Sequence, residues 1–377
     1  MKQSGTTKWV RLGDYIEQCD ERAGDNYTLD YVVGISTDKK LIATKANMDG
    51  VSLNSYKVVK PFEFAYVADT SRRGDKIALA LNTTGKSVLI SSIYTSFRCK
   101  DKKELMPEYL FMLLNRTEFD RYARFNSWGS ARETFDWSEF CRIQIPLPSP
   151  NVQQELVDTY NGIKAIAEQN EALYQRLSTA CHAYIVDCRA KYNAVPLGEY
   201  IEVDEEQNIK NEDLPFMGIN IQKEFMPTNA NTEGLRKEKY LIIRKGQFVF
   251  SGMQTGRDVA IRVGLYASEH PSLISPAYVI FSIKPDKNDK ILPEFLNIQF
   301  RRSESDRLGW FYSDGSIRSN LEWNRFCEFQ IPLPPIEVQK AIVDIYNCAD
   351  RAKKIASEAR ARLKTLCPAL VQRAANS

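Results

Sequence analysis

Residues 129–148 read GSARETFDWSEFCRIQIPLP and residues 315–334 read GSIRSNLEWNRFCEFQIPLP, so that 11 of 20 positions are identical at an offset of 186. Similarity at a fixed offset indicates an internal repeat. The correspondence extends outward, because the segment that starts at Leu12 matches the one at Leu197 and the segment that starts at Pro107 matches the one at Pro293. The chain is therefore a tandem duplication of one unit, with small insertions and deletions in its loops.

Each copy is predicted to begin with a mixed α/β (α+β) domain. Short β-branched and aromatic runs, such as residues 56–59 and 241–243, lie between Gly, Asn, Asp and Ser, a pattern typical of strands joined by turns. Helices are predicted over residues 108–124 and 294–308. The sequence Ile-Pro-Leu-Pro then ends a strand and leads into a long helix in each copy. The predicted boundaries are 1–148 for the first mixed domain, 149–192 for a central helix, 193–334 for the second mixed domain and 335–377 for a C-terminal helix.

Both long helices are predicted to carry the seam of a coiled coil, because apolar residues recur at alternating spacings of three and four. The seam of the C-terminal helix contains a run of alanines between Ile342, Ile345, Leu363, Leu366 and Leu370. The seam of the central helix contains Leu156, Ile163, Ile166, Asn170, Leu173 and Leu177, and the polar Asn170 would fix the register. We expect the helices to form an antiparallel coiled coil with pseudo-twofold symmetry between the copies; the alternative is that each helix packs only on its own domain.

The composition fits two ordinary domains. The chain has 377 residues, 43% of them hydrophobic, and a net charge of +3, which permits nucleic-acid binding without arguing for it. Its eight cysteines are scattered without a Cys-x-x-Cys pair, which suits reduced thiols in the cytoplasm. There is no run of about 18 apolar residues that could span a membrane and no apolar signal core at the N-terminus, so export is not expected.

The sequence lacks the patterns of common catalytic and cofactor sites. Gly85-Lys86-Ser87 ends like a phosphate-binding loop, but Ala80 stands where that loop needs its first glycine. There is no Asp/Asn-Pro-Pro-Tyr/Phe segment of amino-methyltransferases and no Gly-x-Gly turn, and the two histidines are His182 and His270. We therefore expect a chain that is not an enzyme, holds no metal and binds no cofactor itself.

The repeated pattern of Gly-Ser-x-Arg, Trp, Ile-Pro-Leu-Pro, a nearby glutamine (Gln153 and Gln339) and a long helix resembles the specificity subunit (HsdS) of type I restriction–modification systems over essentially the full length. The resemblance implies two target-recognition domains that bind double-stranded DNA, in a bacterial or archaeal cytoplasm and without a membrane partner. It also implies assembly with two adenine-N6 methyltransferase (modification) subunits, which would hold S-adenosylmethionine, and with restriction subunits. One departure between the copies is Pro61-Phe62, where the second copy has Lys245-Gly246.

Two related domains on helical struts suit a bipartite DNA site. Forty helical residues span ~60 Å, and twofold DNA readers place their heads ~34–36 Å apart. Helices of this length can therefore separate two domains that read half-sites with a gap between them. Because the copies differ in most loop residues, the two half-sites should differ as well, which gives an asymmetric bipartite site. One alternative is a duplicated scaffold that binds partner subunits without DNA. The other is the detached specificity half of a fused restriction–methylation enzyme, and the start at Met1 argues against this second alternative.

Loops at equivalent positions of the two copies are the candidate DNA contacts, because phosphates are bound by Lys, Arg and hydroxyl donors and bases by Arg, Asn, Gln, Ser and Thr. The first loop pair supplies Ser36, Thr37, Lys39 and Lys40 with Asn220, Gln222 and Lys223. The second supplies Ser71, Arg72, Arg73 and Lys76 with Gln254, Thr255 and Arg257. The third supplies Asn126, Ser127, Ser130 and Arg132 with Ser313, Ser316 and Arg318, and residues 82–86 form a weaker fourth region.

Each of these residues also has a simpler interpretation. A single Lys or Arg can be an ordinary solvated surface charge, and Arg132 and Arg318 could form ion pairs with Glu139 and Glu322. Trp137 and Trp323 are shared by the copies and flanked by apolar residues, so we interpret them as core anchors rather than DNA contacts.

Overall fold

The structure, a computed structural model, describes residues 7–69, 76–129, 133–228, 231–315 and 319–376. The chain divides into two compact units, which are residues 1–170 with 355–377 and residues 171–354. Each long helix contributes one half to each unit.

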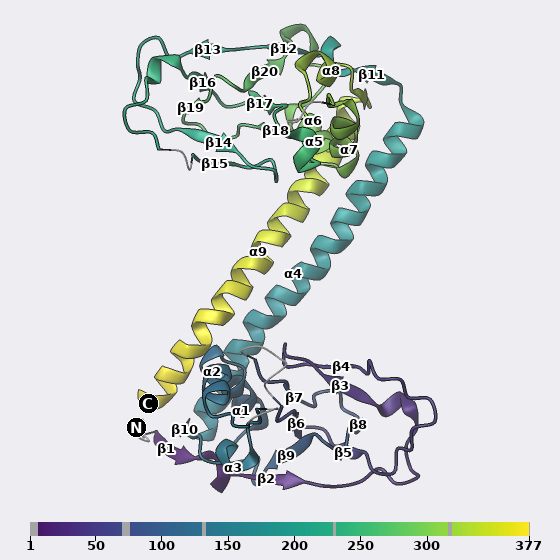
Figure 1. Cartoon of the computed structure of the whole chain (residues 1–377), viewed down its shortest axis with the longest axis vertical. Helices are drawn as coiled ribbons and strands as arrows, with labels where there is room; N and C mark the ends of the chain where they lie inside the picture. Colours follow the sequence, from purple (N-terminus) through teal and green to yellow (C-terminus); the bar gives the residue numbers. More distant parts are fainter. Residues whose placement is uncertain (1–6, 70–75, 130–132, 229–230, 316–318, 377) are drawn as a thin grey trace. The chain divides into compact units, whose positions relative to one another are not determined.

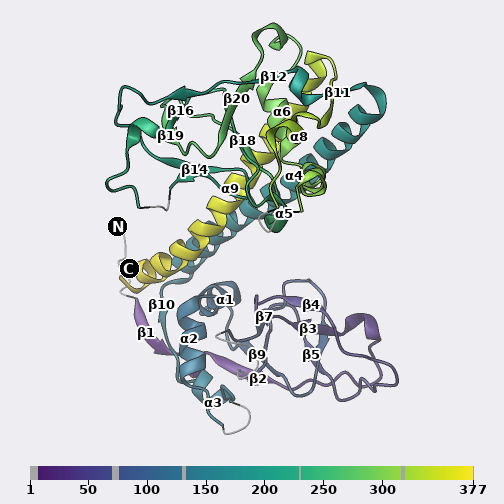
Figure 2. The ribbon, with the colours of Figure 1, turned by 45° about the horizontal axis from the view of Figure 1, so that its top comes forward.

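The first unit combines antiparallel strands with short helices. Its four-stranded sheet has the order β2 (Ile16–Cys19), β9 (Thr95–Cys99), β6 (Phe64–Tyr66) and β7 (Leu79–Leu81). Three antiparallel pairs accompany it, namely β1 (Lys8–Arg11) with β10 (Gln144–Leu147), β3 (Val33–Ile35) with β4 (Leu41–Ala43) and β5 (Lys57–Val59) with β8 (Val88–Ile90). The helices are α1 (Pro107–Leu114), α2 (Thr117–Phe125) and α3 (Trp137–Phe140), with 3-10 turns at Leu12–Asp14 and Leu29–Tyr31. In both views α1 and α2 lie nearer to α4 than β5 does (Figures 1 and 2).

The second unit repeats this topology. Its sheet has the order β12 (Ile201–Val203), β20 (Val279–Ile283), β17 (Phe248–Ser251) and β18 (Arg262–Leu265). The pairs are β11 (Ala194–Pro196) with β21 (Gln330–Pro332), β14 (Met217–Ile219) with β15 (Phe225–Pro227), and β16 (Leu241–Ile243) with β19 (Ser272–Ile274), to which β13 (Glu206–Gln207) adds a third strand. The helices are α5 (Thr255–Asp258), α6 (Pro293–Phe300), α7 (Ser303–Tyr312) and α8 (Trp323–Cys327), with 3-10 turns at Leu197–Glu199, Lys237–Lys239 and Pro285–Lys287. The duplication seen in the sequence is therefore a duplication of the fold.

The helices predicted over residues 108–124 and 294–308 are each broken into two, so the prediction of continuous helices is wrong. Between α1 and α2 the backbone of Arg116 is extended (φ −87°, ψ 153°), and Arg302 has the same conformation between α6 and α7. The Arg116 guanidinium donates to the carbonyl oxygen of Leu113 at 3.0 Å, and the Asn115 amide donates to the Tyr160 hydroxyl at 3.0 Å. The first bond satisfies a carbonyl that a continuous helix would have bonded internally, and the second ties the break to α4.

Equivalent aromatic clusters form the two cores. In the first unit Phe64 stacks on Phe97 with ring centroids 4.7 Å apart, and Trp137 packs against Phe97 and Phe140. In the second unit Phe248 and Phe281 stack at 5.0 Å, and Trp323 takes the place of Trp137. Aromatic pairs of this kind add about 0.5–1.5 kcal/mol each beyond their buried area.

The glutamine that follows Ile-Pro-Leu-Pro attaches the long helix to its unit. Gln153 is fully buried; its amide donates to the carbonyls of Glu104 and Pro148 at 2.8 and 2.9 Å and accepts from the Met106 N–H at 2.9 Å. Gln339 makes the equivalent three bonds to Lys290, Pro334 and Leu292. Each glutamine therefore satisfies backbone groups just before its long helix and just before α1 or α6.

The long helices α4 (Pro150–Lys191) and α9 (Ile336–Asn376) pair within each unit. In the first unit Leu366 of α9 packs on the core that contains Leu156 of α4, and in the second unit Cys181 of α4 packs on the core that contains Ile342 of α9. The first half of each helix thus meets the second half of the other, so the helices run antiparallel. The predicted fold class, tandem mixed domains with two long packed helices, is confirmed, whereas pseudo-twofold symmetry between the units stays a prediction.

The predicted seam of α4 is wrong at several positions. Ile166 and Leu173 are 47% and 46% exposed, whereas the buried residues Ala167, Cys181 and Ile185 follow a stripe displaced by one position. The reason is that α4 packs on its own short helices as well as on α9, which rotates its buried face away from the two-helix seam. On α9 Ile342, Ala349, Ala352, Ala356 and Ala359 are buried, Ile345, Leu363 and Leu366 are half-buried, and the side chain of Leu370 lies outside the described residues.

Candidate nucleic-acid interface

The turns of the β3–β4 and β14–β15 hairpins each place a lysine inward. Lys39 and Lys223 both have a left-handed backbone, with φ of 56° and 65°, and are 5% and 4% exposed. The Lys39 ammonium lies 2.5 Å from the Asp120 carboxylate, and the Lys223 ammonium lies 2.7 Å from that of Asp306. Burial lowers the pKa of both lysines, and the hydrogen bond to the aspartate opposes this shift. The prediction that Lys39 and Lys223 contact DNA is therefore wrong, because their charges are buried and paired.

The same two aspartates connect the loops that the sequence singled out. Asp120 on α2 also accepts the N–H of Ile77 at 3.2 Å, and Asp306 on α7 accepts the N–H of Ile261 at 3.0 Å. One carboxylate thus joins the hairpin turn, the end of the second loop and the helix that leads into the third loop. Sequence analysis missed both aspartates, although the shared Asp-Arg pairs at 120–121 and 306–307, again 186 apart, were an available signal.

In the first unit the second and third loops lie side by side. Asp69 and Trp128 both form bridges with Thr134, and the Phe135 N–H donates to the carbonyl of Ala68 at 2.8 Å. The Asn126 amide donates to the carbonyl of Tyr122, the residue four before it. Five predicted contacts lie outside the described residues, namely Ser71, Arg72, Arg73, Ser130 and Arg132.

The second unit joins the same two loops more extensively. The N–H of Gln254 donates to the Asn320 side chain at 3.1 Å, and the N–H of Gly256 donates to the carbonyl of Ser319 at 2.9 Å. Gln254 also accepts a bond from the Arg257 guanidinium at 2.6 Å, and Ser313 donates to the carbonyl of Gly309. Ser316 and Arg318 lie outside the described residues.

Two predicted hydroxyl contacts are buried. The Ser127 hydroxyl donates to the carbonyl of Ala123 at 2.6 Å, and the Thr255 hydroxyl donates to the carbonyl of Gly252 at 3.0 Å. Both residues are buried, so the prediction that they contact DNA is wrong. Side chains that are exposed or half-buried, and so available to a ligand, are Ser36, Thr37, Lys40, Lys76, Asn126, Asn220, Gln222, Gln254, Arg257 and Ser313.

Comparison with known proteins identifies this arrangement. Residues 196–365 match the family model described as the type I restriction modification DNA specificity domain, and residues before them repeat the same topology. Residues 196–365 therefore form a domain of the type I restriction–modification DNA specificity family. No curated protein matches the sequence.

A solved structure of a specificity subunit shares this fold, and two others are similar at lower TM-scores. The type I restriction–modification S subunit from M. genitalium is 12% identical, with a TM-score of 0.62 over 99% of this chain and 98% of that one. The HsdS subunit from Thermoanaerobacter tengcongensis is 17% identical, with a TM-score of 0.42 over 100% and 98%. A chain from a study of complex assembly and conformational transition of the type I system is 16% identical, with a TM-score of 0.40 over 100% and 99%.

Exposed apolar side chains accompany the loops of both units, and sequence analysis missed them. Phe125 and Trp128 are exposed where α2 leads into the third loop, and Trp310 and Phe311 are exposed at the equivalent end of α7. Apolar side chains in the major groove contact the methyl group of thymine. These exposed aromatic side chains therefore make part of the loop surface apolar.

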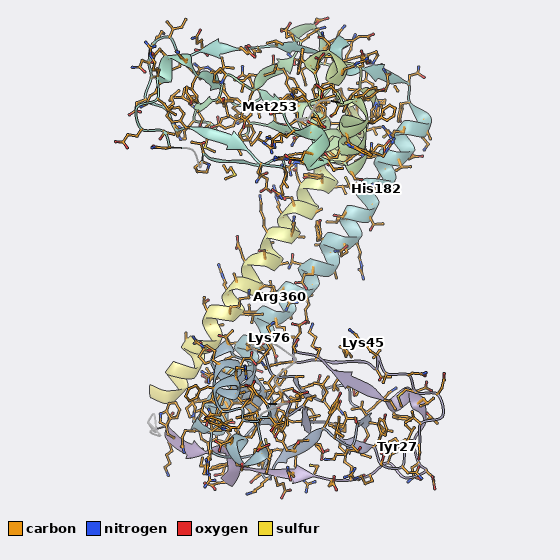
Figure 3. All side chains as sticks on the ribbon, viewed as in Figure 1. Tyr27, Lys45, Lys76, His182, Met253 and Arg360 are labelled. Atoms are coloured by element: carbon orange, nitrogen blue, oxygen red, sulfur yellow. The ribbon has the colours of Figure 1, made fainter. Side chains whose placement is uncertain are left out.

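The second loop of the second unit has a strained backbone conformation. Gln254 and Val259, which flank α5, have left-handed backbones with φ of 61° and 50°. This conformation is a genuine outlier for a β-branched residue such as Val259, and such strain clusters at functional sites. The same loop carries Met253, which is 39% exposed and is labelled in Figure 3.

The described residues offer neither a metal-binding cluster nor a membrane-spanning helix. Within the described residues no cluster of three or more His, Cys, Asp or Glu side chains could hold a metal ion. No helix of that same part of the chain is long and apolar enough to cross a membrane.

Proposed function

We propose that this chain is the DNA sequence-specificity subunit of a type I restriction–modification complex and that each unit reads one half of an asymmetric bipartite site in double-stranded DNA. The main support for this proposal is that the same backbone scaffold occurs twice in the chain with different loop side chains. The Asp120 and Asp306 bonds hold the loop backbones in the same way in both units.

The side chains on these equivalent backbones differ in charge and size. Lys40 and Glu224 occupy the same place in the hairpin turns, since the N–H groups of Ser36 and Asn220 donate to their respective carbonyls. Trp128 likewise corresponds to Asp314 at the offset of 186. Because base readout depends on side-chain donors, acceptors and apolar groups, two units that differ in this way should prefer different sequences.

The same proposal assigns catalysis to partner subunits. Two methyltransferase subunits, which would hold S-adenosylmethionine, and restriction subunits would assemble on this chain, and the chain would contain no catalytic site. Support comes from α4, where Ile166 in the first unit and Leu173 and Tyr184 in the second are exposed on a helix that is already paired with α9. We propose that methyltransferase helices cover these side chains.

The variant Ile166→Glu/Leu173→Glu should abolish co-purification with the methyltransferase, because a charge would be buried without a partner in the assembled interface. The free chain should keep its melting temperature, since both side chains are exposed in it. Gln169→Glu/Gln175→Glu is the matched control, because it adds the same charge at exposed positions of α4. Normal co-purification of the first variant would exclude these side chains from the interface.

Selection from random duplexes tests the proposed function. The chain with its methyltransferase partner should enrich sequences with two unlike half-sites separated by a fixed gap. A scaffold that does not read DNA would enrich no sequence, and either that result or enrichment of a palindrome would contradict the proposal.

A further inference from the structure

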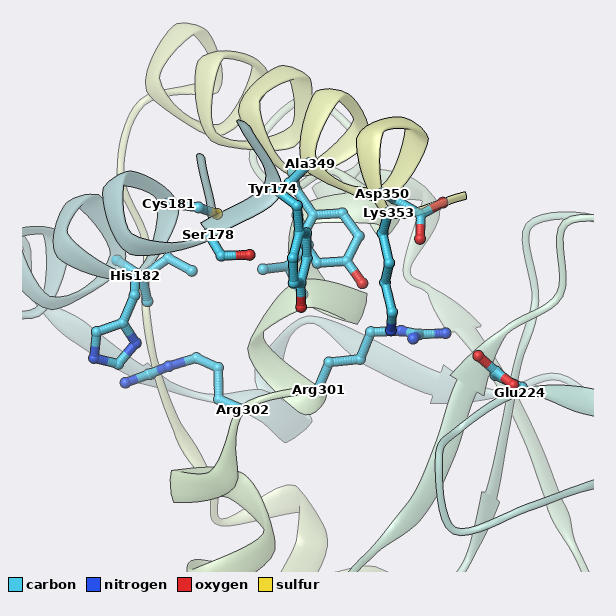
Figure 4. Close-up of a pocket in the computed structure, with 13 residues that line it drawn as sticks. Tyr174, Ser178, Cys181, His182, Glu224, Arg301, Arg302, Ala349, Asp350 and Lys353 are labelled. Atoms are coloured by element: carbon cyan, nitrogen blue, oxygen red, sulfur yellow. The ribbon is translucent and has the colours of Figure 1, made fainter. Parts of the chain in front are cut away.

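Each unit has a hollow at the same place in the repeat. The hollow of the first unit, about 470 Å³, lies where the break between α1 and α2 meets Tyr160 of α4 and Arg360 of α9. The hollow of the second unit, about 270 Å³, lies where the break between α6 and α7 meets Tyr346 of α9 and Tyr174 of α4 (Figure 4). Arg360 corresponds to Tyr174 at the offset of 186, as Tyr346 does to Tyr160, so the two hollows are copies of one site.

The charges around the two copies differ strongly. A second hollow beside Tyr160 adds Lys40 and Lys164 to the cations of the first unit. We define the basic groove as Lys40, Lys76, Arg116, Lys164, Arg360 and Lys364. The equivalent residues of the second unit, in the same order, are Glu224, Ala260, Arg302, Asp350, Tyr174 and Ser178. Six positive charges in one unit thus correspond to one positive and two negative charges in the other.

The remaining cations around the second hollow are engaged within that unit. Arg301 donates to the carbonyl of Lys223 at 3.1 Å, and the Lys353 ammonium lies over the ring of Tyr174, 5.9 Å from its centroid. Arg302 is half-buried, and this burial, together with nearby Arg189, lowers the pKa of its guanidinium. Glu224 and Asp350 oppose these cations, so the second hollow carries less net positive charge than the basic groove.

The basic groove is open to solvent and adjoins the candidate DNA interface. The side chains of Lys76 and Lys164 are 56% and 40% exposed, and their acidic neighbours Asp38 and Glu168 lie 3.6 and 4.0 Å away. Exposed pairs of this kind contribute little, so a stronger anion can replace them. Lys76 directly precedes Ile77, whose N–H binds Asp120, and Figure 3 shows it near Arg360. The groove therefore extends the loop surface of the first unit onto both long helices.

We propose that the basic groove binds DNA backbone phosphates and that the equivalent surface of the second unit does not. The first unit then supplies most of the electrostatic contribution to DNA affinity. This inference rests on the proposed function. A duplex carries one negative charge per ~1.7 Å of its axis. A row of cations is therefore matched better by a row of phosphates than by a single acidic side chain. The second unit depends correspondingly more on its loops.

Exchange of the charges between the copies tests this inference in the complex with the methyltransferase. Lys76→Ala/Arg360→Tyr/Lys364→Ser gives the first unit the residues of the second and should reduce the slope of log K against log salt by about 2–3, at ~0.9 per lost phosphate contact. The selected sequences should stay the same. The reverse exchange, Ala260→Lys/Tyr174→Arg/Ser178→Lys, should increase the slope.

Controls separate the possible outcomes. Lys8→Ala/Lys103→Ala/Arg142→Ser removes the same charge outside the groove and should leave the salt slope unchanged. The single variant Lys364→Ser, at an exposed position, should reduce the salt slope by about 0.9 even if the triple variant of the groove folds poorly. An unchanged slope with intact sequence selection would overturn the groove and leave the proposed function standing. Lost co-purification of the triple variant with the methyltransferase would also overturn the proposal and would assign the groove to an acidic protein surface. Absence of sequence selection by the unmodified complex would contradict the proposed function itself.

Discussion

Asp120→Ala is expected to destabilise the first unit by about 3–5 kcal/mol, the usual effect of removing one partner of a buried ion pair. The substitution leaves the Lys39 ammonium buried at 5% exposure without its carboxylate, and it also removes the acceptor of the Ile77 N–H. The hairpin turn, the second loop and α2 would lose their common attachment. Urea unfolding combined with hydrogen exchange of α2 measures the effect and assigns it to the first unit.

Two comparisons make this prediction specific. Asp306→Ala should cost less, because the Lys223 ammonium keeps a bond to the carbonyl of Phe300 at 2.7 Å. Arg121→Ala, at the next position of α2, should change stability by less than about 0.5 kcal/mol because its side chain is 75% exposed. A loss below about 1 kcal/mol in Asp120→Ala would show that the buried pair does not hold the loops.

Insertion of one heptad into both long helices, after Asn170 of α4 and after Lys354 of α9, is expected to lengthen the gap between the half-sites by about three base pairs. Seven helical residues add ~10.5 Å, and base pairs follow one another at ~3.4 Å. Both helices must be extended because each pairs antiparallel with the other in both units. Affinity for the original site should fall toward the nonspecific level, ~10³-fold or more, while a site with the longer gap gains it.

The single insertion in α4 is the control for this experiment. It displaces one helix against the other and should weaken binding to every spacing. If the doubly extended protein still selected the original gap, the helices would not set the spacing.

Much of the fold was predictable because it is encoded locally and written twice. The repeat predicted two equivalent domains, and Ile-Pro-Leu-Pro followed by three-and-four spacing predicted where α4 and α9 begin. The breaks at Arg116 and Arg302 were not predictable from spacing alone, because apolar residues continue across them. They depend on bonds such as that between Asn115 and Tyr160, which are close only in the folded chain.

The candidate site was predicted less well, and for a physical reason. A lysine in a loop is usually solvated, so Lys39 and Lys40 look alike in the sequence. Only the tertiary structure places Asp120 beside Lys39 and leaves Lys40 exposed. The α4 seam failed similarly, since two apolar stripes lie one position apart on that helix and packing against the short helices selects one of them.

The most direct test of the account exchanges residues 1–148 for the corresponding domain of another specificity protein with a known site and maps the sequences that the assembled complex then selects. We predict that one half-site changes to that of the donor, while the other half-site and the gap stay the same. A change in both half-sites, or in neither, would contradict the claim that each unit reads its own half.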